Sequence, residues 1–129
     1  MELTENQIAT VVIDSSFTVH TRLGPGLLES VYESVLEYEI KKAGLSVARQ
    51  KPIALEYDGL VFTEGFRADL LVAEKVIVEL KSVEKIAPLH QKQVLTYLKL
   101  SNLKLGLLIN FGSAYLKDGV SRVINGYLE

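Results

Sequence analysis

Two carboxylates and a lysine in one short stretch could carry out metal-assisted chemistry. Asp69, Glu79 and Lys81 all lie within Phe66–Ser82, FRADLLVAEKVIVELKS. A hard divalent cation such as Mg²⁺ is usually bound by one or two protein carboxylates, and water and phosphate complete its coordination. An amine beside it supplies a positive charge or, if its pKa is lowered, a proton acceptor. A solvated sheet face with an ordinary ion pair is the alternative interpretation.

The same stretch predicts the hairpin that would bring these groups together. Phe66–Val72 and Val76–Ser82 are rich in Val, Leu and Ile, and only Ala73–Lys75 separates them, which is typical of two paired strands. Side chains alternate faces along a strand, so Glu79 shares its face with Lys81. A loop of those three residues then places Asp69 opposite Glu79, with Cβ atoms roughly 4.5–5.5 Å apart.

Composition limits the other kinds of chemistry. A chain of 129 residues, nearly half of them hydrophobic, predicts a single domain spanning residues 1–129. The absence of cysteine excludes disulfides and thiolate ligands, so a metal would be held by oxygen or by His20 and His90. No apolar run is long enough to span a membrane and the acidic start lacks a signal peptide's basic flank, which predicts a cytoplasmic protein.

The charge pattern bears on nucleic-acid binding in two ways. The net charge of −2 argues against a protein that holds nucleic acid by bulk electrostatics alone. Residues 1–40 contain seven acidic and one basic side chain, whereas residues 41–104 contain eleven basic and seven acidic ones. The segment with the expected hairpin is therefore the basic one, although a solvated face explains the asymmetry about as well.

Hydrophobic periodicity and turn residues predict the elements around the hairpin. The expected helices are Leu3–Leu23, Leu27–Ala43 and Pro88–Ser101. The further expected strands are Leu45–Gln50, Pro52–Tyr57, Val61–Glu64 and Lys104–Phe111, followed by a last hairpin of Ala114–Lys117 and Val120–Asn125. The order strand, helix, strand at the hairpin's end predicts a parallel pair of Val76–Ser82 and Lys104–Phe111. The expected fold class is thus α/β, or mixed α+β, with a central mixed sheet flanked by helices.

Two helices carry further candidate residues. Glu29 lies in the first turn of its helix, where it would either stabilise the helix dipole or point towards the metal. His90, Gln93 and Tyr97 fall on one arc of the helix Pro88–Ser101, and polar groups beside a core need partners. They would face the metal site or merely bind backbone groups at the sheet edge. His20 would either lie near the metal or, as is commoner for a partly buried histidine, have its hydrogen bonds satisfied within the fold.

Together these residues resemble the PD-(D/E)XK nuclease superfamily, and within it the small proteins named for the motif GxxExxY. That motif reads Gly26-Leu-Leu-Glu29-Ser-Val-Tyr32, and the resemblance continues through FRADLLV, VELKS, HQKQVLTYLKL and the terminal NFG and LKDG. It implies a restriction-endonuclease-like core. It also implies metal binding by Asp69, Glu79 and Glu29, a catalytic Lys81, and substrate placement by Gln93 and Tyr97. Ala68 stands where the motif's name has proline, a residue without a role in coordination.

The function expected from this resemblance is a Mg²⁺- or Mn²⁺-dependent nuclease, a hydrolase of phosphodiester bonds in DNA or RNA. Glu29, Asp69, Glu79 and Lys81 would be catalytic, and Gln93, Tyr97 and His90 would bind substrate. A homodimer is a further expectation, because a domain of this size often needs a second copy to grip a duplex. The alternatives are a catalytically inactive module of the same fold that binds nucleic acid or protein, and a plain structural subunit.

Overall fold

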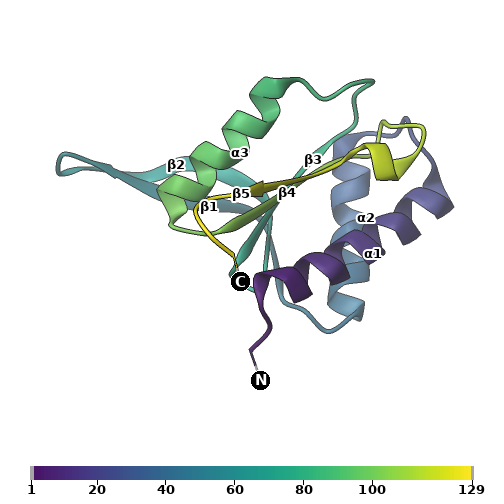
Figure 1. The fold of residues 1–129 in the computed structure, drawn as a ribbon, viewed down its shortest axis with the longest axis horizontal. Coiled ribbons are helices and arrows are strands. Elements are labelled where there is room, and N and C mark those ends of the chain that lie inside the picture. Colours follow the sequence, from purple (N-terminus) through teal and green to yellow (C-terminus); the bar gives the residue numbers. More distant parts are fainter. Residues whose placement is uncertain (1, 129) are drawn as a thin grey trace.

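The computed structural model describes residues 2–128, which form three α-helices, five strands and one short 3₁₀ helix (Figure 1). The helices are α1 (Glu5–Leu23), α2 (Glu29–Lys42) and α3 (Pro88–Ser101), and η1 is the 3₁₀ turn Leu116–Asp118. The strands are β1 (Val47–Tyr57), β2 (Leu60–Val72), β3 (Val76–Lys81), β4 (Leu105–Asn110) and β5 (Val120–Ile124). None of these helices is long and apolar enough to cross a membrane.

All five strands form one mixed sheet in the order β1-β2-β3-β4-β5. β3 and β4 run parallel, and every other neighbouring pair is antiparallel. The parallel pair expected from the strand–helix–strand order is therefore confirmed, and α3 is the connection between its two strands. The fold is of the α/β class, as the sequence predicts.

Helices cover both faces of the sheet (Figure 1). α1 and α2 pack with Val76, Val78 and Leu80 of β3 in one apolar cluster, while α3 packs with Ile77 in a second cluster. Adjacent residues of β3 belong to opposite clusters because side chains alternate along a strand. β3 and β4 are thus central strands covered on both sides, consistent with their almost unbroken apolar sequences.

The ends of the helices follow from local sequence. Thr4 and Gln7 form a capping box at the start of α1, each side chain bonding the other residue's backbone N–H, which satisfies two donors that the first helical turn leaves free. Pro88 begins α3, a position where proline's missing N–H has no consequence. These local signals fix where two of the three helices begin.

β1 and β2 form a long hairpin that projects from the body of the molecule (Figure 1). The sequence predicts short separate strands here, but each side is continuous, with 11 residues in β1 and 13 in β2. Asp58 and Gly59 turn the chain with φ of 48° and 82°, the left-handed pair of a two-residue hairpin turn. The expected Asp-Gly turn is therefore confirmed. The breaks expected within the two strands do not end them, although β1 is irregular at Gln50 and its register with β2 shifts between Ile53 and Leu55.

The expected last hairpin is wrong. Residues 114–117 form no strand, and Leu116 begins η1 instead. β5 pairs with β4, where Leu107 stands opposite Arg122. Asp118 is the last residue of this 3₁₀ turn and Gly119 is its C-cap, so the dipeptide is not the turn of a hairpin. The physical reason is that β5 completes the sheet by adding to a buried central strand, which a local hairpin signal cannot indicate.

Candidate active site

The two acids of the central hairpin meet where β2 and β3 separate. Leu70 pairs with Val78, and the pairs continue to Val72 and Val76 at the loop, so the same register places Asp69 opposite Glu79. The backbone N–H of Asp69 donates to Oε1 of Glu79 at 3.2 Å. In return Oδ2 of Asp69 accepts the N–H of Leu80 at 2.9 Å. Each carboxylate therefore replaces part of the backbone ladder, and the predicted juxtaposition of these acids is confirmed.

Burial and mutual repulsion change the proton affinity of this pair. Glu79 is only 9% exposed, and its pKa is raised from 4.5 to about 8. Burial is the largest cause, followed by the negative charge of Asp69 and a hydrogen bond between the two side chains, while the charge of Lys81 opposes the shift of this pKa. This raised pKa favours the protonated form of Glu79, because two adjacent carboxylates cannot both ionise readily.

This donor set fits a hard divalent cation. Two neighbouring carboxylates that repel one another are stabilised electrostatically when a divalent cation binds in place of the proton. Within residues 2–128 no three His, Asp or Glu side chains are arranged as a ligand cluster. The protein would thus supply Asp69 and Glu79 and leave the other positions to water and phosphate, which is the usual arrangement for Mg²⁺. Glu29 is not in contact with them as a third ligand, and its metal-binding role stays a prediction.

Lys81 ends β3 two residues beyond Glu79, close enough for its charge to act on the Glu79 pKa. The next residue, Ser82, donates its hydroxyl to the carbonyl of Leu27 at 2.7 Å. Leu27 lies in the loop that leads into α2, whose first residue is the exposed Glu29. The Lys81 end of β3 and the Glu29 end of α2 are therefore fastened together, although Glu29 itself remains on the surface.

The tyrosine of the GxxExxY motif holds that loop. The Tyr32 hydroxyl donates to the carbonyl of Gly24 at 2.5 Å and accepts the N–H of Leu27 at 3.1 Å. Its ring is fully buried and lies parallel to Phe111 at 4.6 Å between centroids. Tyr32 is thus an architectural residue that fixes the approach of the chain to Glu29.

α3 brings one of its three candidate residues to the acids. The Tyr97 ring stacks on Phe66 of β2 at 4.1 Å between centroids. Partial burial first, and then the charges of Glu79 and Asp69, hold the pKa of the Tyr97 hydroxyl above its ordinary value. Tyr97 therefore stands beside the carboxylates.

The other two α3 candidates have different surroundings. Gln93 is exposed one helical turn before Tyr97. His90 accepts the backbone N–H of Ala87 through Nδ1 at 3.2 Å, and so caps the start of α3. Substrate binding by Gln93 and His90 stays a prediction. His20 donates from Nε2 to the carbonyl of Ser113 at 2.9 Å, in keeping with the structural reading of this histidine.

Sequence reasoning missed Gln50 of β1. Its side-chain amide nitrogen lies 3.0 and 3.2 Å from the two carboxylate oxygens of Glu33 and 3.4 Å from Oδ1 of Asp69. Glu33 is a buried residue of α2, 6% exposed, one turn beyond Glu29. No motif marks a glutamine in a mixed polar strand, and only the register of β1 against β2 could have placed it near Asp69.

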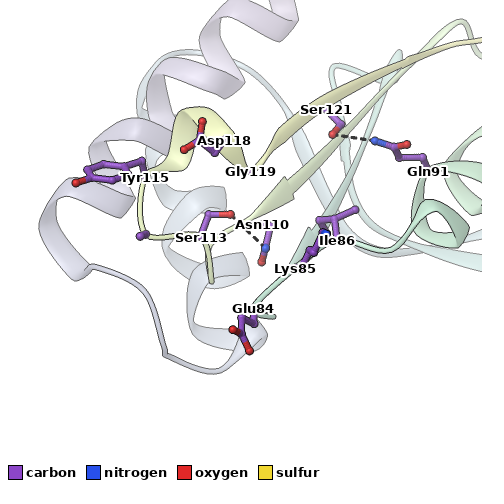
Figure 2. A pocket seen from close by; sticks show the side chains of 11 residues that line it. Glu84, Lys85, Ile86, Gln91, Asn110, Ser113, Tyr115, Asp118, Gly119 and Ser121 are labelled. Atoms are coloured by element: carbon purple, nitrogen blue, oxygen red, sulfur yellow. Dashed lines mark hydrogen bonds between the residues drawn. The ribbon is translucent and has the colours of Figure 1, made fainter.

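A pocket of about 420 Å³ lies elsewhere, between the segment after β3 and the loop before β5 (Figure 2). Asp69, Glu79 and Lys81 do not line it. Its buried Asn110 is fully engaged, with Oδ1 accepting from Val83 and Gly112 and Nδ2 donating to the Val83 carbonyl and to Ser113. Because the paired acids lie outside this pocket, we place the candidate active site at Asp69 and Glu79.

A sequence model of the PD-(D/E)XK nuclease superfamily matches residues 6–123. The chain therefore belongs to the PD-(D/E)XK nuclease superfamily. No curated protein and no solved structure matches it significantly. The matched range includes the acidic hairpin with Lys81, α2, α3 and all of α1 but its first residue, so the superfamily resemblance seen in the sequence is confirmed.

Proposed function

We propose that the protein is a Mg²⁺- or Mn²⁺-dependent nuclease that hydrolyses phosphodiester bonds of DNA, or of RNA, and that it belongs to the GxxExxY group of its superfamily. The observation that supports this most is the close approach of the Asp69 and Glu79 carboxylates, each of which accepts a backbone N–H from the other's strand, with Lys81 near enough to act on the pKa of Glu79. Acids so placed are the protein's share of a magnesium site.

Each residue has a separate role in this proposal. Asp69 and Glu79 hold the cation, which when bound polarises the phosphate and makes a water molecule more acidic. Lys81 positions that water and offsets negative charge on the phosphate. Tyr97, with Gln93 and His90 on the same side of α3, orients the nucleic-acid backbone. Glu29, the first residue of α2, is a further candidate ligand of the cation.

The setting of the reaction is part of the same proposal. We propose a single nuclease domain over residues 1–129 that acts in the cytoplasm. A homodimer would allow two such sites to engage one duplex.

Cleavage of plasmid, single-stranded DNA and RNA in Mn²⁺ or Mg²⁺ tests the proposal. We expect Asp69→Ala and Lys81→Ala to lose about 100-fold or more in rate, because charge stabilisation and proton transfer each contribute on this scale. Lys92→Ala is the matched control, since Lys92 is an exposed lysine of α3. Cleavage by Asp69→Ala at the wild-type rate would show that the site is wrongly assigned.

A catalytically inactive binding module is the second candidate. The tip of the β1–β2 hairpin favours it, because Tyr57, Leu60 and Val61 are 67%, 61% and 69% exposed, and exposed apolar patches often bind proteins. Calorimetric titration with Mn²⁺ separates the two candidates. The nuclease must bind the ion through Asp69 and Glu79, and the binding module need not.

A further inference from the structure

Gln50 connects Asp69 to a buried acid on another element. Its side-chain NH₂ group has three carboxylate oxygens within 3.4 Å, two of Glu33 and one of Asp69. An amide NH₂ carries two donors, enough to bond both acids at once. Gln50 thereby joins α2 to the candidate metal-binding strand.

The backbone of β1 is distorted at this residue. Gln50 has a φ of 48°, in the left-handed region that residues other than glycine rarely occupy. Arg49 and Gln50 both bond Glu33, whereas consecutive residues of a regular strand point to opposite faces. The unusual φ therefore lets the amide of Gln50 turn towards Glu33 and Asp69.

The facing strand is irregular at the same level. Gln50 and Asp69 stand opposite one another between the pairs Arg49–Leu70 and Lys51–Ala68. Leu70 and Ala68 are two residues apart, yet they belong to the clusters on opposite faces of the sheet. Strained backbone that persists in a folded chain marks a position held by its surroundings, often a functional one.

A purely structural role for Gln50 does not account for all its contacts. Arg49 already ties β1 to α2 through Glu33 at 3.4 Å and Glu37 at 3.7 Å. What Gln50 adds is the bond to Oδ1 of Asp69. The other oxygen, Oδ2, accepts the N–H of Leu80, so the Asp69 carboxylate is held at both oxygens and its orientation is fixed.

We propose that Gln50 is a positioning residue, which together with Glu33 orients the Asp69 carboxylate for a divalent cation. This inference rests on the proposed metal-dependent function. Partners of this kind behind a ligating side chain commonly change metal affinity by 10–100-fold when they are removed.

Calorimetric titration of the 129-residue chain with Mn²⁺, together with thermal unfolding, tests this. Gln50→Gly removes the amide and accepts the left-handed φ without strain, so we expect about tenfold weaker Mn²⁺ binding with little change in the unfolding temperature. Gln50→Ala removes the same amide and keeps the strain, so it should weaken Mn²⁺ binding equally and also unfold at a lower temperature. Lys51→Ala, the exposed next residue, should match wild type in both measurements.

A double-mutant cycle tests the role of Glu33. We expect Glu33→Gln to weaken Mn²⁺ binding in the wild-type background and to have no further effect in Gln50→Gly, because the influence of Glu33 passes through the amide. If wild type binds Mn²⁺ and Gln50→Gly binds it equally well, the positioning role is overturned and the proposed function stands. If wild type binds no Mn²⁺, the proposed function fails, and this inference with it.

Discussion

At the scale of single residues, the repulsion between the Asp69 and Glu79 carboxylates is reduced within the protein itself. Each accepts a backbone N–H from the other strand, and burial together with the negative charge of Asp69 raises the pKa of Glu79. A proton and a divalent cation therefore compete for the same pair of acids, and binding of the ion should release a proton.

This competition predicts a pH-dependent stability. The pKa of Glu79 is about 8 in the folded chain against an ordinary 4.5, so the folded state holds the proton more tightly. The stabilisation is fully present below about pH 4.5 and is lost as pH rises through 8. Metal-free wild type should lose at most about 1.4 kcal/mol of unfolding free energy per pH unit in that window. Urea unfolding in a chelator at several pH values measures it.

Glu79→Gln should remove this slope, because glutamine has the shape of the protonated acid and does not titrate. It should also abolish the rise in stability that saturating Mn²⁺ gives the wild type at pH 8. Glu84→Gln, at an exposed acid, is the matched control and should keep both behaviours. A Glu79→Gln protein whose stability still falls between pH 5 and 8 would show that another group carries the proton.

At the scale of elements, the seat of α3 on the sheet depends on one glycine. A Cβ on Gly106 of β4 would lie 2.5 Å from Cγ1 of Val94 and 3.4 Å from Leu98, both buried on α3. We expect Gly106→Ala to destabilise the protein by about 1–3 kcal/mol, as overpacked cores commonly do. It should also impair cleavage, because α3 carries Tyr97.

Val94→Ala removes the methyl group in question. The double variant Gly106→Ala/Val94→Ala should therefore recover part of the stability that Gly106→Ala loses, which denaturant unfolding of all four proteins measures. If the losses of unfolding free energy in the two single variants add up in the double variant, the strain caused by Gly106→Ala does not come from contact with Val94.

The elements also show how far the sequence could predict the structure. The three-residue loop and the apolar strands around it set the register of Asp69 and Glu79, because a local hairpin leaves one sensible pairing. α3 was equally predictable from Pro88 and its apolar stripe. Residues 114–117 were wrongly expected to be a strand, since the pairing of β5 with β4 is a contact between distant segments.

Gln50 shows the same limit at the site. Its role depends on a left-handed φ and on acids from α2 and β2, 17 and 19 residues away in the chain. Neither hydrophobic periodicity nor turn residues can predict that these three side chains lie close together. Asp69, Glu79 and Lys81 were accessible to sequence reasoning because they sit on one hairpin.

At the scale of the whole molecule, the end of the β1–β2 hairpin takes little part in the core. Residues 54–64 contain three acidic side chains and no basic ones, and Phe62 is still 49% exposed. Such an acidic surface is poorly suited to nucleic-acid phosphates. Any nucleic acid should therefore bind to the rest of the molecule.

We therefore expect Leu60→Ser and Phe62→Ser to change the unfolding free energy by no more than about 0.5 kcal/mol, as exposed positions generally do. Cleavage rate and Mn²⁺ affinity should be those of wild type, because the tip is remote from Asp69 and Glu79 along the sheet. Unfolding and cleavage assays of both variants check this. A large loss of cleavage without loss of stability would instead assign the tip to substrate binding.

Within the part of the chain that the structure describes, the hydroxyl of Tyr32 bonds two main-chain groups, the carbonyl of Gly24 and the N–H of Leu27. Because Tyr32 holds this loop through main-chain atoms, the loop does not depend on the side chains of Leu27 and Leu28 for its position. These side chains are 41% and 74% exposed. Substitutions at Leu27 and Leu28 should therefore leave the backbone of this loop unchanged. The loop lies next to the end of β3, where the Leu27 carbonyl accepts a hydrogen bond from Ser82. Among relatives that share the tyrosine, these two positions should therefore be free to differ in sequence.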